Sequence, residues 1–182
     1  MKLPASVEGR ERARLFCALR LPDDALDRLC EWQAEQLDGR VVVREHLHIT
    51  LAFLGHRPVA ELEQIVGATR DAAAGARPMR LEPVRYRETR SVGMLVLSDE
   101  DGSATAVAED LHRRLEGLGV YERENRPWLP HVTVLRFRQR PRLQPPLPEL
   151  GEFSPSDAAV YHSVLLSTGA QYVVVESFAL GG

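Results

Sequence analysis

The sequence has few cysteines, almost no lysine and no long apolar segment. Its 182 residues include only Cys17 and Cys30, so neither a disulfide framework nor a cysteine-based zinc pattern is present, and a reducing compartment is expected. No apolar run approaches the length of a transmembrane helix, and the N-terminal segment lacks the apolar centre of a signal peptide. These features predict a cytoplasmic protein that makes no use of a membrane.

The charge balance argues against one broad class of nucleic-acid-binding protein. The formal net charge is −3, which does not suit electrostatic coating of nucleic acid over a whole surface. All but one of the 23 basic residues are Arg, and six of these lie close together in the sequence: Arg123, Arg126, Arg136, Arg138, Arg140 and Arg142. Arg forms forked hydrogen bonds with phosphate oxygens, so the cluster is a candidate phosphate-facing rim. The alternative is that an Arg-rich chain uses Arg everywhere, and Glu122 and Glu124 dilute the cluster.

Apolar periodicity predicts a mixture of strands and helices. Strands are expected at residues 14–21, 46–54, 79–87, 92–97 and 131–137, and "DAAVYHSVLLS" with "QYVVVESFAL" is typical of a hairpin. Amphipathic helices are expected at residues 24–37, after Pro58, and around Leu111. Strands and helices do not alternate steadily, which favours an α+β fold with largely antiparallel sheets. We expect one domain over residues 1–182, with residues 1–13 as a flexible N-terminal extension.

Two motifs, "HLHITLAFLG" and "RPWLPHVTVLR", each place a His and a Thr at alternate positions of a predicted strand. Random placement of six His and six Thr would give about 0.2 His-x-Thr triplets, whereas the chain has two. Because side chains alternate along a strand, His48 and Thr50 share one face, and the apolar residues up to Phe53 face the core. His131 and Thr133 repeat this arrangement. The two pairs are therefore candidates for a single active site.

The two pairs offer the groups that hydrolysis of a cyclic phosphodiester requires. Two imidazoles near the reference pKa of about 6.5 can act as general base and general acid. One would take a proton from the attacking water and the other would protonate the departing ribose oxygen, while Thr hydroxyls donate to phosphate oxygens. A single His in an apolar strand is ordinarily structural, but its duplication favours the catalytic interpretation.

The remaining histidines give weaker signals. His46 and His48 form a His-x-His pair, but no further ligand shares their face, so we predict no metal site. His56, His112 and His162 are interpreted as packing or surface residues. No cofactor-binding motif is found, and none is expected.

These motifs resemble the 2H phosphoesterase superfamily, specifically its RNA 2′,3′-cyclic phosphodiesterase branch, also called 2′-5′ RNA ligase. "RLFCALRLP" is similar to the family's opening strand, the two motifs to its HxTx motifs, and the last hairpin to its terminal hairpin. The resemblance implies a bilobal α+β fold, with two pseudo-symmetric lobes of largely antiparallel sheets around a central cleft and helices outside. It also implies hydrolysis of an RNA-terminal 2′,3′-cyclic phosphate to a 2′-phosphomonoester without metal or cofactor.

The resemblance further implies roles for single residues. His48 would be the proton donor and His131 the proton acceptor, an assignment that the residues alone leave open. Thr50 and Thr133 would contact the phosphate. Arg136 matches a phosphate-binding Arg three positions after the second Thr. Strict alternation puts it on the opposite face, so contact would require a β-bulge, a strand end or a curled side chain.

The expected substrates are RNA ends or small cyclic nucleotides, and the expected state is a monomer. Trp128 and Phe53 could stack on a base, although loop and core packing are preferred for them. Two alternatives stay open. One is the reverse reaction, which joins RNA ends through a 2′-5′ bond, and the other is a non-catalytic module that binds RNA ends.

Overall fold

The computed structural model describes residues 5–167 and 169–181. Its elements are β1 (Arg12–Arg20), α1 (Asp23–Gln36), β2 (Arg40–Val41), η1 (Arg44–His46), β3 (His48–Pro58), η2 (Val59–Glu61), α2 (Leu62–Ala74), β4 (Glu82–Glu88), β5 (Val92–Ser98), α3 (Ser103–Gly117), β6 (His131–Arg136), β7 (Asp157–Leu166) and β8 (Gly169–Ala179). The predicted strands and helices are confirmed, with ends shifted by a few residues. Within the described residues, no helix has the length and apolar content that a membrane span needs.

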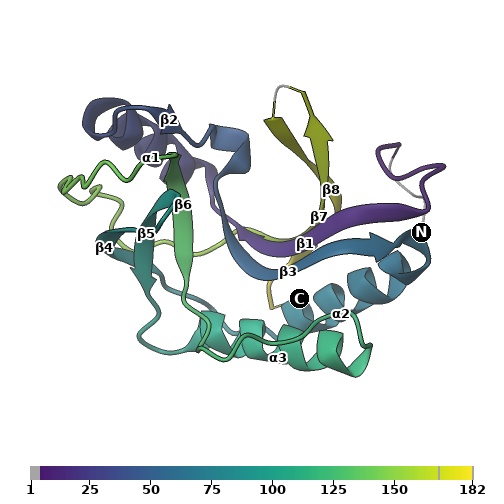
Figure 1. The fold of residues 1–182 in the computed structure, drawn as a ribbon. Helices are drawn as coiled ribbons and strands as arrows, with labels where there is room; N and C mark the ends of the chain where they lie inside the picture. Colours follow the sequence, from purple (N-terminus) through teal and green to yellow (C-terminus); the bar gives the residue numbers. More distant parts are fainter. Residues whose placement is uncertain (1–4, 168, 182) are drawn as a thin grey trace.

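The strands form one antiparallel sheet in the order β4-β5-β6-β3-β1-β7-β8, and β2 pairs with β6. The sheet curls, so that β6 and the β7–β8 hairpin stand on opposite sides of β1 and β3 (Figure 1). Its two halves meet where Ile49 of β3 pairs with Val132 of β6. The predicted α+β fold with antiparallel strands is confirmed, and this junction joins the two expected sheets into one.

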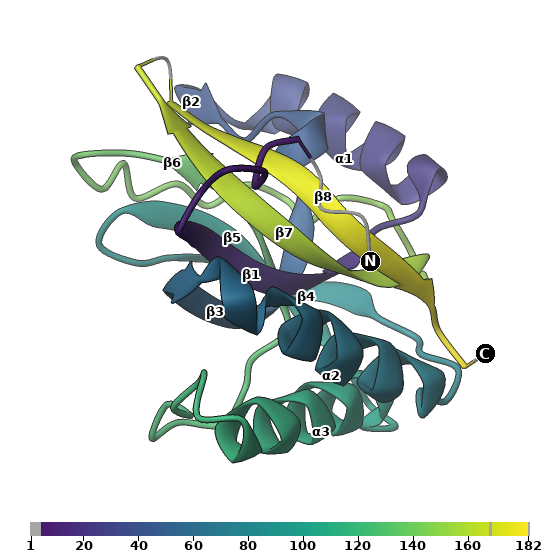
Figure 2. The ribbon, with the colours of Figure 1, turned by 90° about the vertical axis from the view of Figure 1, so that its right-hand side faces the viewer.

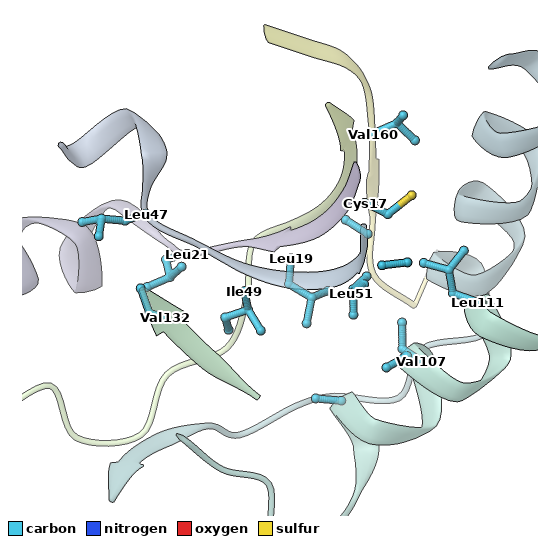
Figure 3. Close-up of a cluster of buried hydrophobic side chains, with 14 of the residues drawn as sticks. Cys17, Leu19, Leu21, Leu47, Ile49, Leu51, Val107, Leu111, Val132 and Val160 are labelled. Carbon is cyan, nitrogen blue, oxygen red and sulfur yellow. The ribbon is translucent and has the colours of Figure 1, made fainter. Parts of the chain in front are cut away.

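The helices cover the sheet from two sides. Figure 2 shows α2 and α3 side by side below the strands and α1 above them. Leu19, Ile49 and Val132 are buried together, and Leu111 of α3 approaches Leu51 from the helical side (Figure 3). Burial of these apolar residues leaves the other face of β3 and β6 for polar side chains, and we call that side the cleft face.

The chain before residue 14 contributes to the fold. β1 begins at Arg12, two residues inside the segment expected as an N-terminal extension. The side chain of Val7 is fully buried in the core. Residues 1–4, the first part of that expected extension, lie outside the described residues.

Candidate active site

The two His-x-Thr motifs lie beside one another at the junction of the two halves. Four partly buried side chains surround the Ile49 and Val132 pair on the cleft face: His48, Thr50, His131 and Thr133. The antiparallel register sets the His of each motif opposite the Thr of the other. Diagonal neighbours in such a pair are about 7–8 Å apart, so the two imidazoles flank a space suited to one phosphate group.

Each imidazole is oriented by the backbone two residues before it. Nδ1 of His48 lies 2.8 Å from the carbonyl oxygen of His46, and Nδ1 of His131 lies 2.8 Å from that of Leu129. Since a carbonyl oxygen only accepts, Nδ1 carries the hydrogen in both rings. In the neutral form of such a ring Nε2 is the acceptor, and Nε2 of His48 lies 3.1 Å from the hydroxyl of Thr50.

The surroundings of His48 disfavour its protonated form. Burial is the largest of the effects that lower its pKa to about 4. The hydrogen bond to His46 opposes the shift, whereas the positive charges of His46, His131 and Arg136 add to it. His48 is therefore neutral at pH 7 in the free protein, and the guanidinium of Arg136 contributes a positive charge near it.

Aromatic residues account for much of this burial. The ring centroid of His48 lies 5.0 Å from that of Phe16 and 5.7 Å from that of Tyr172. Tyr172, which comes from β8, also lies 4.3 Å from His46. Tyr172 was missed by sequence reasoning, because nothing local in the sequence indicates that β8 curls back over the first motif.

A β-bulge lies directly after the Thr of each motif. In β3 the register against β1 skips Leu51, and in β6 the register against β5 skips Val134. Each skipped residue directly follows the Thr of its motif, and each bulge reverses the alternation of side chains between the two faces. The residues three positions after each Thr, Phe53 and Arg136, therefore lie on the cleft face.

The two bulges change the faces on which Phe53 and Arg136 were expected to lie. Phe53 was assigned to the core face by strict alternation, and this is wrong, because its side chain is 51% exposed. The guanidinium of Arg14 lies 4.9 Å from the centre of its ring. Strict alternation also put Arg136 on the opposite face, but a β-bulge, one of the three features that would allow phosphate contact, is present, and Arg136 is exposed on the cleft side.

A buried side chain from a helix holds each bulge. Nε2 of His112 in α3 lies 2.7 Å from the carbonyl oxygen of Leu51, to which it donates. The amide of Gln33 in α1 donates to the carbonyl oxygen of Val134 at 2.8 Å and to that of Val42 at 3.1 Å. His112 therefore has the packing role expected for it. Gln33 was missed, and its only signal was a polar residue on an otherwise apolar helix face.

A pocket opens beside the motifs where β3 and β6 separate. It has a volume of about 720 Å³, begins at Thr50 and His131, and extends to Phe53 and Arg87. The indole N–H of Trp128 donates to the carbonyl oxygen of Thr50 at 2.9 Å. Trp128 therefore anchors the loop before β6, in agreement with the preferred interpretation.

The members of the arginine cluster differ in their partners. Three members form ion pairs with Glu side chains: Arg123, Arg126 and Arg140. Arg136 instead lies opposite Arg40 of β2. Like charges directly opposite one another are destabilising, and a bound anion would relieve their repulsion. Arg40 was missed by sequence reasoning, because β2 is only two residues long.

The cleft face combines two imidazoles, two hydroxyls and a guanidinium around one space. Among the described residues, no group of three or more His, Cys, Asp or Glu side chains is placed to hold a metal ion. The arrangement suits binding of a phosphate group with a proton acceptor and a proton donor on either side of it.

Comparison with known sequences gives consistent matches over most of the chain. Residues 21–171 match the family described as the 2′-5′ RNA ligase superfamily. The RNA 2′,3′-cyclic phosphodiesterase of Thermus thermophilus is 32% identical over 190 residues, which cover 93% of this chain and 91% of that protein. The protein of the same name from Escherichia coli is 27% identical over 175 residues, which cover 93% and 98%.

Solved structures share the fold. A crystal structure of a Thermus thermophilus protein has a TM-score of 0.77 at 28% identity, covering 93% of this chain and 98% of that one. Escherichia coli LigT complexed with 3′-AMP has a TM-score of 0.78 at 22% identity, covering 94% and 100%. Because the identity to LigT is only 22%, this similarity shows a shared fold alone.

Proposed function

Because this chain belongs to the 2′-5′ RNA ligase superfamily, we propose that it hydrolyses 2′,3′-cyclic phosphates, at RNA ends or in small cyclic nucleotides, to 2′-phosphomonoesters. The observation that carries the proposal is the register that sets the His of each motif opposite the Thr of the other around one space. The relatives from Thermus thermophilus and Escherichia coli are named RNA 2′,3′-cyclic phosphodiesterases, which supports this substrate class.

In the proposed reaction, His48 and His131 are the catalytic pair. Nε2 of one ring takes a proton from water as the water oxygen attacks phosphorus. The bond from phosphorus to the 3′ oxygen breaks, and Nε2–H of the other ring protonates that oxygen. Each proton transfer typically contributes about 10²–10⁴-fold in rate. The Thr50 and Thr133 hydroxyls and the Arg136 guanidinium hold the non-bridging oxygens, and neither metal nor cofactor takes part.

The donor role implied for His48 requires its pKa to rise when substrate binds. In the free protein the pKa of about 4 keeps this ring neutral. A phosphate anion placed between the rings favours the charged form of the imidazole and so raises its pKa. The pH profile of kcat/KM reports the pKa values of the free enzyme, and the pH profile of kcat reports those of the enzyme–substrate complex. If His48 is the proton donor, the fall in activity at high pH should therefore occur at a higher pH in the kcat profile than in the kcat/KM profile.

The test compares single His→Ala variants with EDTA present. Turnover of a 2′,3′-cyclic nucleotide by His48→Ala and by His131→Ala should fall by at least about 10²-fold, with circular dichroism unchanged. His56→Ala is the matched control, because His56 lies exposed on β3 outside the motifs and should leave turnover intact. Full activity in either of the first two variants, or loss of wild-type activity in EDTA, would overturn the proposal.

The family description also supports the reverse activity as a second candidate. The same site can join a 2′,3′-cyclic end to a 5′-hydroxyl RNA fragment, since microscopic reversibility uses the same two proton transfers. Incubation with both fragments and identification of the linkage distinguish ligation from hydrolysis. Tight binding of the cyclic end without turnover by the wild-type chain would instead identify a binding module.

A further inference from the structure

The cleft face continues from β6 across β5 to the edge strand β4. Thr133 pairs with Met94, and Met94 pairs with Arg87. Residues paired across antiparallel strands share a face, so Arg87 lies on the cleft face about 10 Å from Thr133, at two strand spacings. In the same way, His131 pairs with Val96 of β5, and Val96 pairs with Arg85 of β4. Two arginines of the edge strand are thus in register with the second motif.

These two arginines are available to a ligand. Arg85 and Arg87 are both exposed. In the part of the chain that the structure describes, neither has a carboxylate oxygen within 4.0 Å. By contrast, Arg123 and Arg126, which line the pocket beside the motifs, are paired with Glu116 and Glu124.

The loop after β6 adds two further arginines beside the same strand. The buried carboxylate of Glu88 accepts hydrogen bonds from the backbone N–H of Arg142 (2.9 Å) and of Leu143 (2.8 Å) and from Nε of Arg140 (3.1 Å). Burial alone would raise the pKa of Glu88, but these hydrogen bonds outweigh it and lower the pKa. The ionised carboxylate therefore fixes the loop against β4, with Arg142 held at a positive φ of 61°.

The four arginines line one open groove, and one of them also lines the pocket beside the motifs. The groove has a volume of about 610 Å³, and its lining includes Arg85, Arg87, Arg140 and Arg142. Arg87 also lines the pocket that begins at Thr50 and His131. Glu88 also lines the groove and offsets the charge of Arg140, so the excess of positive charge comes from Arg85, Arg87 and Arg142, in a chain whose net charge is −3.

We propose that this arginine groove binds the backbone phosphates of an RNA chain whose cyclic 3′ end lies between the two motifs. The inference rests on the proposed function and narrows its substrate class. An RNA end carries phosphodiesters on the 5′ side of its last nucleotide, whereas a free cyclic mononucleotide carries none. Contacts from Arg85 and Arg87 would therefore favour RNA ends over free cyclic nucleotides.

Charges on an edge strand can also serve only to prevent pairing with other strands. Under that alternative, removing Arg85 and Arg87 would promote aggregation and would leave the preference between substrates unchanged. A comparison of two substrates therefore separates the two roles.

The experiment uses the Arg85→Gln/Arg87→Gln double variant with two substrates. One is 2′,3′-cyclic AMP with a free 5′-hydroxyl, and the other is a pentaribonucleotide that ends in the same cyclic nucleotide. We expect kcat/KM for the pentaribonucleotide to fall about 10-fold, mainly through KM, and kcat/KM for cyclic AMP to stay within about twofold. The logarithmic salt dependence of pentaribonucleotide binding should become shallower by roughly 0.7 for each phosphate that the variant no longer neutralises.

The matched control is Arg70→Gln/Arg113→Gln, which removes the same charge from exposed positions on α2 and α3. This control should leave kcat/KM unchanged for both substrates. Fluorescence anisotropy with a pentaribonucleotide ending in a 2′-phosphate measures binding without turnover. Equal changes in kcat/KM for both substrates, or unchanged binding of the pentaribonucleotide by the double variant, would overturn the proposal that the arginine groove binds RNA. If the wild-type chain turned over neither substrate, the proposed function would fail, while the binding measurement would still decide whether the groove holds RNA.

Discussion

The ionisation of His48 should make the stability of this protein depend on pH by a calculable amount. The pKa of this ring lies at about 4 in the folded protein, against a reference value of 6.5, chiefly because of burial. The folded state therefore takes up the proton less readily than the unfolded chain. Stability is unaffected by this group above pH 6.5 and is lost as pH falls toward 4. The full loss corresponds to about 3 kcal/mol, of which about 2 kcal/mol is reached at pH 5.

His48→Asn is the variant that isolates this effect. Its side-chain N–H can replace Nδ1–H as donor to the carbonyl of His46, but it does not titrate. Urea unfolding at pH 7 and pH 5 should show that the wild-type protein loses about 2 kcal/mol more than the variant. The other titrating groups are common to both proteins and cancel in the comparison. Equal losses in the two proteins would refute the conclusion that His48 is held neutral by its surroundings.

Two further substitutions test the frame around the motifs. Gln33→Met keeps the length of the side chain but removes the donor to two buried carbonyl oxygens, so urea unfolding should show a loss of about 1–3 kcal/mol. Unchanged stability would mean that Gln33 does not hold the bulge. Arg136→Gln removes the repulsion from Arg40 and should raise the free energy of unfolding by roughly 0.2–1 kcal/mol at low salt. The same variant should lower kcat/KM for a cyclic substrate, and a loss of stability would contradict the register of β2 against β6.

The sequence predicted the secondary structure and the shared face of each His-x-Thr pair because both depend on local periodicity. Ile49 and Val132 occupy positions that periodicity assigns to the core, and their burial does place the polar residues beside them on the other face. The pairing of these two residues was not predictable in detail, because the choice of a strand partner is decided by packing across the whole sheet. The internal repeat of the motif was the only sequence signal that the two segments meet.

The errors arose where the sheet is irregular. Leu51 and Val134 look like ordinary apolar strand positions, and a bulge is defined only by the register of a partner strand. The reversal of alternation after Leu51 is why Phe53 was wrongly assigned to the core. The contributions of Tyr172 and Arg40 were invisible for a related reason, since each comes from a segment that reaches the motifs only through the curl of the sheet.

The two halves repeat one local design, and they differ at one position that matters for chemistry. Each half has a His-x-Thr motif, a bulge directly after it and a helix side chain on the bulge carbonyl, but the third residue after Thr is Phe53 in one half and Arg136 in the other. The charge of Arg136 is among the causes that lower the pKa of His48. A phosphate bound against Arg136 would offset that charge and so raise the pKa of the imidazole. Burial is the main cause that keeps His48 neutral in the free protein, and a phosphate bound against Arg136 would remove one of the smaller contributions to that effect.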